Sequence, residues 1–259
     1  MVKILFLFLM MSSSFAFTLN TTSEARFKKR SVYMYVEGSQ GCSNLRFTNE
    51  EILDIAVEAA DKFWNHAPNS RLRLKKGGVT LLGSAFHTAT ICTNGVGAAS
   101  CEPNPALSVP SNILITCNVN PINFSNSTSV LGVSVINNIS GDKIIGSILA
   151  LNDMPNSALL AKTRDELVSI IAHELGHAIG LGHSEVRDSL MYFQSIPDRT
   201  ALGYDDIDGV AYLYPAKQPV SCGTVSTTAD GNGPLIYSLA LGLLLGTFLM
   251  GRFARVWSL

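Results

Sequence analysis

The sequence predicts an α+β fold in which a β-sheet packs on two long helices. Five segments are rich in β-branched and other apolar residues, as expected of strands: residues 32–36, 79–82, 113–116, 130–136 and 144–151. Two other segments begin with a helix-capping pattern and then repeat apolar residues every three or four positions. At 259 residues, the chain is long enough for one such domain with a substantial core.

The first helix is predicted over residues 49–65. Thr48 and Glu51 form a capping-box pattern, in which each side chain bonds a backbone N–H at the start of the helix. Apolar residues then recur on one face: Ile52, Ile55, Ala56, Ala59 and Phe63. We expect Trp64 to pack with this stripe, and His66 to cap the helix or face solvent.

The second helix carries the residues that indicate chemistry. Thr163 and Glu166 form another capping box, and the helix then contains His-Glu-Leu-Gly-His from His173 to His177. Residues four apart lie on one helix face, with Cβ atoms about 5–6 Å apart, so both imidazoles can reach one metal ion. Glu174 lies beside that face, where its carboxylate can hydrogen-bond a water molecule at the metal.

A third histidine follows a predicted turn. Gly180 ends the helix, because glycine adopts the left-handed conformation without a steric penalty from Cβ. The chain can then place His183 as a third ligand, which leaves one position for water, as in catalytic zinc sites. A solvated helix can also contain His-Glu-x-x-His, but the longer pattern is far more specific. The sequence therefore predicts a zinc hydrolase.

The full pattern resembles the metzincin metallopeptidases, and most of all the matrixin family. Besides the three histidines, the resemblance rests on Ser184 directly after the last of them and on Met191 in the following turn. Astacins and serralysins have a tyrosine two residues after this methionine, where the present chain has Phe193. The similarity covers about residues 32–215 and includes the block 202–214.

The resemblance implies a metzincin-like zincin fold. Such a fold has a twisted, mainly parallel mixed sheet packed on two long helices, with a short C-terminal helix after the methionine turn. Met191 would form the hydrophobic floor under the three imidazoles. Asp205 and Asp206 would anchor the methionine turn or the mature N-terminus, although simple capping of a helix N-terminus also explains them.

The implied activity is hydrolysis of peptide bonds in extracellular proteins with one catalytic zinc ion. Glu174 would act as general base toward the zinc-activated water. Residues 130–136 would be an edge strand along which substrate lies, although an interior strand fits the same pattern. Residues 193–202 would line an apolar pocket for the residue after the scissile bond. The alternatives are a membrane-tethered binding or adhesion module with a vestigial zinc site, and a zinc hydrolase of non-peptide substrates.

Two matrixin features have no counterpart in this sequence. Matrixins keep themselves latent with a propeptide cysteine, but no cysteine precedes Cys42. The second, structural zinc of many matrix metalloproteases needs several histidines in the middle region, where His87 stands alone. We therefore predict no second zinc. Calcium is possible, but no aspartate-rich loop of recognisable spacing supports it.

Apolar segments at both ends predict export and anchoring. Residues 1–16 have the pattern of a secretory signal peptide cleaved after Ala16, with an N-terminal anchor as the alternative. Residues 235–251 are uncharged and would form a helix of about 26 Å, the short end of what crosses a bilayer. A transmembrane helix, a sorting signal that is removed and a buried core helix all fit this second segment.

The remaining segments complete the predicted organisation. Residues 17–31 are polar and basic and predict a pro-segment or linker, whose basic cluster is either a processing site or a solvated tail. The catalytic domain would occupy residues 32–215, outside the cell or on its surface. Residues 216–234 predict a flexible stalk, and residues 252–259 a basic cytoplasmic end.

Charge and cysteine content constrain the partners and the compartment. A net charge of −1 with 15% charged residues gives no support for nucleic-acid binding, so the expected partners are protein or peptide substrates and a membrane. Five cysteines in an exported chain predict disulfides. Cys92 and Cys101 are the natural local pair, which leaves Cys42 and Cys117 for each other, although sequence does not fix the connectivity. Cys222 is left for pairing between chains, a modification, a sorting motif or a free thiol.

Overall fold

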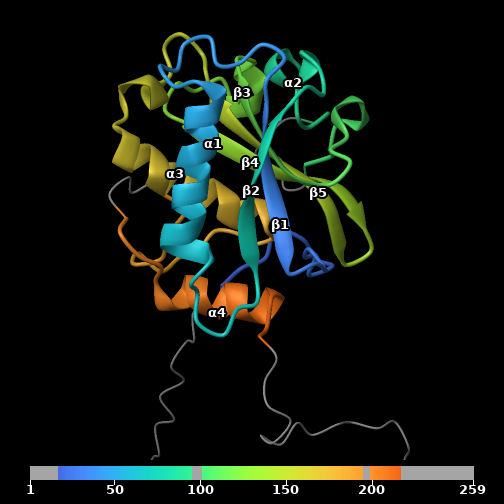
Figure 1. The fold of residues 1–259 in the computed structure, drawn as a ribbon, viewed down its shortest axis with the longest axis vertical. Coiled ribbons are helices and arrows are strands. Elements are labelled where there is room, and N and C mark those ends of the chain that lie inside the picture. The colour runs from blue at the N-terminus through green and yellow to red at the C-terminus, as the bar shows by residue number, and fades with distance from the viewer. Residues whose placement is uncertain (1–16, 95–100, 195–198, 217–259) are drawn as a thin grey trace, which may run out of the picture. The chain divides into compact units, whose positions relative to one another are not determined.

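A computed structural model describes residues 17–94, 101–194 and 199–216 (Figure 1). Its centre is a five-stranded sheet with the strand order β2-β1-β3-β5-β4. The strands are β1 (Ser31–Glu37), β2 (Arg73–Thr80), β3 (Asn112–Asn118), β4 (Gly132–Ser140) and β5 (Lys143–Asn152). Only β4 runs antiparallel to its neighbour, and it forms one edge of the sheet. The predicted α+β fold with a mainly parallel mixed sheet is confirmed.

Two long helices pack against one face of this sheet, as predicted (Figure 1). They are α1 (Asn49–Ala59), which continues into a π-helical turn (Ala60–Trp64), and α3 (Arg164–Ala178). The expected C-terminal helix is α4 (Tyr204–Leu213), and α2 (Ala85–Thr88) is a single turn. Short 3₁₀ turns lie at Pro105–Leu107, Pro121–Phe124 and Ala158–Ala161.

Both predicted capping boxes are confirmed. The N–H of Glu51 donates to the Thr48 hydroxyl, and the N–H of Thr48 donates to the Glu51 carboxylate at 2.8 Å. Thr163 and Glu166 form the same pair of bonds at the start of α3. The capping box therefore fixes the start of α3, the helix that carries two of the histidines, directly after Thr163.

The other face of the sheet is covered largely by the connection between β2 and β3. Phe86, Ile91 and Leu107 from this connection pack there against residues of β3, β4 and β5. The disulfides Cys92–Cys101 and Cys42–Cys117 both form, with Cα–Cα distances of 5.3 and 5.2 Å. The expected pairing of these four cysteines is therefore confirmed.

Residues 17–31, which the sequence presents as a pro-segment or linker, pack on the domain. Ala25 and Phe27 are 0% and 5% exposed. The N–H of Phe27 donates to the hydroxyl of Tyr214, just after α4, at 3.1 Å. These contacts make the segment part of the folded unit, in contrast to a solvated tail.

The first edge strand, β2, differs from its predicted position at residues 79–82. It begins earlier, at Arg73, and ends at Thr80. Leu81 and Leu82, which the prediction included, lie beyond the strand and are 75% and 42% exposed.

Within the described ranges, no helix combines the length and the apolar character needed to cross a bilayer. Residues 1–16, the expected C-terminal helix at 235–251 and the basic end at 252–259 lie outside those ranges, as do Cys222 and nearly all of the expected stalk.

Candidate metal centre

Helix α3 and the loop after it bring three histidines together. The ring centroids of His173, His177 and His183 lie between 4.6 and 5.5 Å apart. One ligand atom from each lies within 4.8 Å of the others, and the Nε2 atoms of His177 and His183 are 3.2 Å apart. Two nitrogens bound to one tetrahedral zinc ion at about 2.0–2.1 Å would be separated by about 3.3 Å. The group therefore fits a single ion.

Backbone carbonyl groups orient the two helical imidazoles. Nδ1 of His173 donates to the carbonyl of Leu190 at 2.7 Å, and Nδ1 of His177 donates to that of Leu181 at 2.9 Å. A carbonyl oxygen only accepts, so each Nδ1 carries the hydrogen and each Nε2 keeps a free lone pair. Such hydrogen bonds fix the tautomer and ring direction of metal-binding histidines.

Burial favours the neutral form of all three imidazoles. It lowers the pKa of His173 to about 4; the hydrogen bond to Leu190 opposes this shift, and the nearby His183 reinforces it. Burial also lowers the pKa of His177 and His183. Metal ions bind the neutral imidazole, so the three side chains are in the ligand form at neutral pH.

Gly180 makes the turn that leads to the third histidine. Its φ is +114°, which is strained for any residue with a Cβ. The N–H of Gly180 donates to the carbonyl of His177 at 3.0 Å, and the N–H of Leu181 donates to the carbonyl of Gly176 at 2.9 Å. These two hydrogen bonds are those of a Schellman motif at a helix C-terminus. A Cβ atom at Gly180 would also lie 2.6 Å from the carbonyl oxygen of Ala25.

The methionine turn packs under α3 and is held by Asp206. The side chain of Met191 is 2% exposed, and a Cβ atom at Gly176 would lie 2.2 Å from its sulfur. The backbone N–H groups of Leu190 and Met191 donate to the Asp206 carboxylate at 2.6 and 3.0 Å, and the Ser189 hydroxyl also donates to it. The side chain of Asp206 thus contacts the turn directly.

The neighbouring Asp205 has a different environment. It is 8% exposed, and its carboxylate forms no hydrogen bond or ion pair with any residue in the described part of the chain. Phe17 lies against the same helix, because its Cβ and Cγ are 3.2 and 3.1 Å from the place of a Cβ at Gly209. Its ring also contacts that of Tyr212, with centroids 5.4 Å apart.

Glu174 is buried beside the histidines. Its side chain lies at the start of β4, where a Cβ atom at Gly132 would be 3.2 Å from its Cγ. Burial raises the pKa of Glu174 to about 7, and the Ser134 hydroxyl opposes that shift. A divalent ion beside the carboxyl group would favour its charged form. Its Oε2 atom has no hydrogen-bond partner within the described ranges and can therefore accept a proton or a donor.

Residues near the N-terminus contact the end of α3 and the loop that carries His183. The sequence did not indicate these contacts. The side-chain amide of Asn20 donates to the carbonyl of His177 at 3.1 Å. The N–H of Gly182 donates to the carbonyl of Thr18 at 2.8 Å, and Thr18 donates through its hydroxyl to the carbonyl of His183. No motif in residues 17–31 predicts these contacts, because they depend on where the segment crosses the loop.

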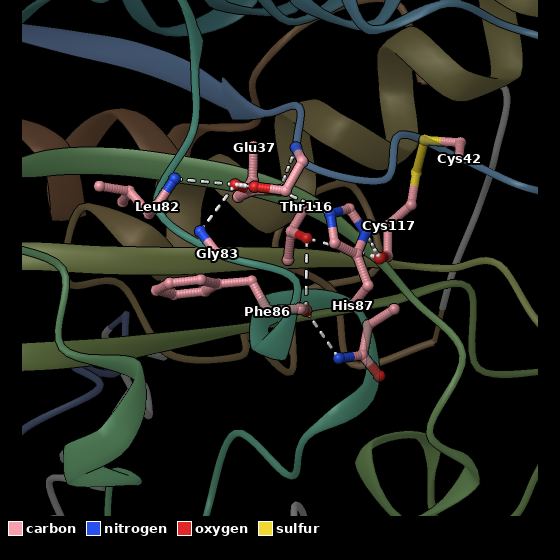
Figure 2. A network of polar contacts seen from close by, with 10 residues as sticks. Glu37, Cys42, Leu82, Gly83, Phe86, His87, Thr116 and Cys117 are labelled. Carbon is pink, nitrogen blue, oxygen red and sulfur yellow. Dashed lines mark hydrogen bonds and ion pairs between the residues drawn. A yellow bond between two sulfur atoms is a disulfide. The ribbon is translucent and has the colours of Figure 1, made fainter.

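His87 is engaged elsewhere, as Figure 2 shows. Its Nε2 lies 2.6 Å from Oε2 of Glu37 and its Nδ1 lies 2.8 Å from the carbonyl oxygen of Cys117. Burial raises the pKa of Glu37, but hydrogen bonds from Ser39, Gly83 and His87 outweigh this effect and leave it below its ordinary value. Both ring nitrogens of His87 therefore have partners within the protein.

A mainly parallel sheet on two helices, with His-Glu-x-x-His on the second and a third histidine beyond a glycine turn, defines a metal centre of the metzincin class. The family model described as matrixin matches residues 16–215. The chain therefore belongs to the matrixin family, whose metal is zinc, and the residues of the three-histidine group suit that ion.

Several known proteins are similar over part of the chain. Metalloendoproteinase 2-MMP of Arabidopsis thaliana is 43% identical over 63 residues, which is 24% of this chain and 16% of that protein. Stromelysin-2 of Rattus norvegicus is 36% identical over 102 residues, or 36% and 21% of the two chains. Matrix metalloproteinase-19 of Homo sapiens is 35% identical over 88 residues, or 29% and 17%. The matched regions thus span about a fifth or less of each of these three relatives.

Proposed function

We propose that the protein is a zinc-dependent endopeptidase that hydrolyses peptide bonds in extracellular proteins. The observation that carries the proposal is the convergence of His173, His177 and His183 beside a buried glutamate whose Oε2 has no partner in the described part of the chain. A binding module with a vestigial zinc site would have no need of that carboxylate.

The roles of the residues follow from their chemistry. The three imidazoles hold the zinc ion, which when bound supplies a Lewis acid that acidifies water and stabilises negative charge on the substrate carbonyl oxygen. Glu174 accepts the proton of the attacking water and delivers it to the departing amine. Gly180 positions His183. Met191 packs against α3, and Asp206 holds the turn that contains Met191.

The free edge of β4 is the proposed substrate platform. An extended peptide can pair with its backbone N–H and C=O groups regardless of sequence. The start of β4 lies against Glu174, so a peptide on this edge would pass close to the proposed base. Phe193, which is 53% exposed, begins the segment that we propose as the apolar pocket for the residue after the scissile bond.

Asp205 is the proposed partner of the mature N-terminus. Cleavage after Ala16 would create an ammonium group on Phe17, whose side chain packs against α4, the helix that carries this buried carboxylate. An ion pair there would satisfy both charges. N-terminal sequencing of the secreted protein should begin at Phe17, and a start at residue 31 or later would contradict this role.

We also propose that the chain is exported and held at the cell surface by residues 235–251. The supports are the sequence patterns at the two ends and the extracellular character expected of an endopeptidase of this family. Fractionation of cells that express the full chain should find it in the membrane fraction and accessible to external protease. Recovery only as a soluble protein would contradict the anchor.

The test of the proposed activity compares the protein with its Glu174→Ala variant. Zinc content is measured together with cleavage of casein or a peptide library, with and without a chelator. We expect about one zinc ion per chain in both proteins, chelator-sensitive cleavage by the first, and a loss of at least about a hundredfold in the variant.

The possible results separate the candidate functions. Cleavage that survives Glu174→Ala would show that Glu174 is not the base. A zinc-loaded protein that cleaves neither casein nor any library peptide would favour the binding module or a hydrolase of other substrates, and a metal-free, inactive protein would contradict the proposal altogether.

A further inference from the structure

The edge strand β4 brings a serine to the carboxyl group of Glu174. Side chains alternate between the two faces of a strand, so Gly132 and Ser134 share the face turned toward α3. On the other face of the sheet, Val135 is buried in the core and Val133 packs against it, partly buried.

Gly132 determines how closely the strand approaches. A Cβ atom at this position would lie 3.2 Å from Cγ and 3.3 Å from Cδ of Glu174. Glycine therefore lets β4 lie directly against the glutamate side chain, and Ser134 presents its hydroxyl two residues further along the same face.

Two polar atoms without partners lie at this contact. Oε2 of Glu174 and Oγ of Ser134 are both buried, and neither has a hydrogen bond within the described ranges. One atom accepts and the other can donate, so they are complementary. The Ser134 hydroxyl also lies within interaction range of the Glu174 carboxyl group.

We propose that Ser134 is a positioning residue for Glu174. In the zinc-loaded protein its hydroxyl would donate a hydrogen bond to Oε2, which would leave Oε1 to face the water that the glutamate deprotonates. The inference rests on the proposed endopeptidase function, because it concerns the same carboxyl group. Ser134 acts through Glu174 and takes no part in the reaction itself.

The kinetic test uses the full chain with Ser134→Ala and Ser134→Thr. Loss of one hydrogen bond to a charged group should lower kcat about tenfold in Ser134→Ala, with KM and zinc content unchanged. Ser134→Thr keeps the hydroxyl and should restore kcat to near the parent value. Ser23→Ala makes the same chemical change in an exposed turn outside β4 and serves as the matched control.

A crystal structure of the zinc-loaded parent supplies a readout that does not depend on turnover. The proposal expects Oγ of Ser134 within about 2.5–3.0 Å of a Glu174 carboxylate oxygen. A separation beyond hydrogen-bond reach, an unchanged kcat in Ser134→Ala, or equal impairment by alanine and threonine would overturn it. If the parent cleaves no peptide, the proposed function fails, while the measured distance still decides whether the serine holds the glutamate.

Discussion

At the scale of single residues, the position of His183, the proposed third zinc ligand, depends on Gly180. Its positive φ and the 2.6 Å approach of the Ala25 carbonyl oxygen to a Cβ position leave no room for a side chain. His183 follows three residues later, so any displacement of this turn moves a ligand. The turn therefore couples backbone geometry directly to metal binding.

Gly180→Ala should destabilise the protein by about 1–3 kcal/mol and weaken zinc binding, because both strain and a clash are introduced. Zinc titration and urea unfolding measure the two effects. Gly141→Ala is the control, since Gly141 also has a positive φ, of +60°, but has open space around its Cβ position. Equal zinc affinity in the two variants would contradict this account of the turn.

The residues of the site differ in how far the sequence could predict them. The histidine pair, Glu174 and Gly180 could be predicted because helix geometry and a helix end fix their spacing. The contact of Asn20 and the proposed contact of Ser134 could not, because each depends on the place where a distant segment crosses α3 or its loop. A serine or an asparagine alone gives no signal of such a contact.

At the scale of elements, the start of α3 is fixed by its capping box. Hydrogen bonds from the Thr163 backbone, from Lys162 and from the Thr163 hydroxyl lower the pKa of Glu166 to about 2. A carboxyl group whose pKa is lower in the folded state stabilises the fold above its ordinary pKa. Glu166 should therefore stabilise the domain at neutral pH.

This stabilisation should disappear as the pH falls from about 4.5 to about 2, between the ordinary and the folded pKa of Glu166. Glu166→Gln should have a lower Tm than the parent at pH 7, and the difference should vanish near pH 2. Thermal unfolding across this range measures the effect, with Asp165→Asn in the same helical turn as control. A Tm difference that does not change with pH would contradict the role of the charge.

The helix starts could be predicted more accurately than the strands. Thr48 and Thr163 mark their helices because capping is a local interaction. The first part of β2 was missed because Lys75 and Lys76 face solvent on an edge strand, which hides the alternation of a half-buried strand. Leu81 and Leu82 are apolar and therefore fit a strand pattern, although they are exposed and lie beyond the end of β2.

At the scale of the whole molecule, a buried polar pair joins segments distant in the sequence. Glu37 ends β1 and accepts hydrogen bonds from the backbone N–H groups of Leu82 and Gly83 at 2.9 and 3.1 Å, while His87 in α2 contacts both Glu37 and Cys117 (Figure 2). The side chains of the pair are 0% and 4% exposed. Removal of either partner leaves buried polar groups without partners.

His87→Ala should destabilise the protein by about 1–3 kcal/mol, as expected when a buried hydrogen-bonding group loses its partner. Urea unfolding measures the loss. Lys76→Ala breaks the exposed pair with Asp54 and should leave stability nearly unchanged, because solvent screens exposed pairs. A similar effect of both variants would contradict the structural importance of the buried pair.

The overall architecture could be predicted because the motif belongs to a family with a known arrangement of sheet and helices. The packing of residues 17–31 on the domain could not, because their polar composition hides the two buried side chains, Ala25 and Phe27, that attach them. Tertiary contact, rather than composition, decides whether such a segment belongs to the domain.

The most direct measurement is zinc K-edge X-ray absorption on the purified protein. Three imidazole nitrogens at about 2.0–2.1 Å and one oxygen from solvent are expected, because three histidines converge and one position stays open. A protein that binds no zinc, or a fourth protein ligand that closes the site, would contradict the proposed catalytic centre.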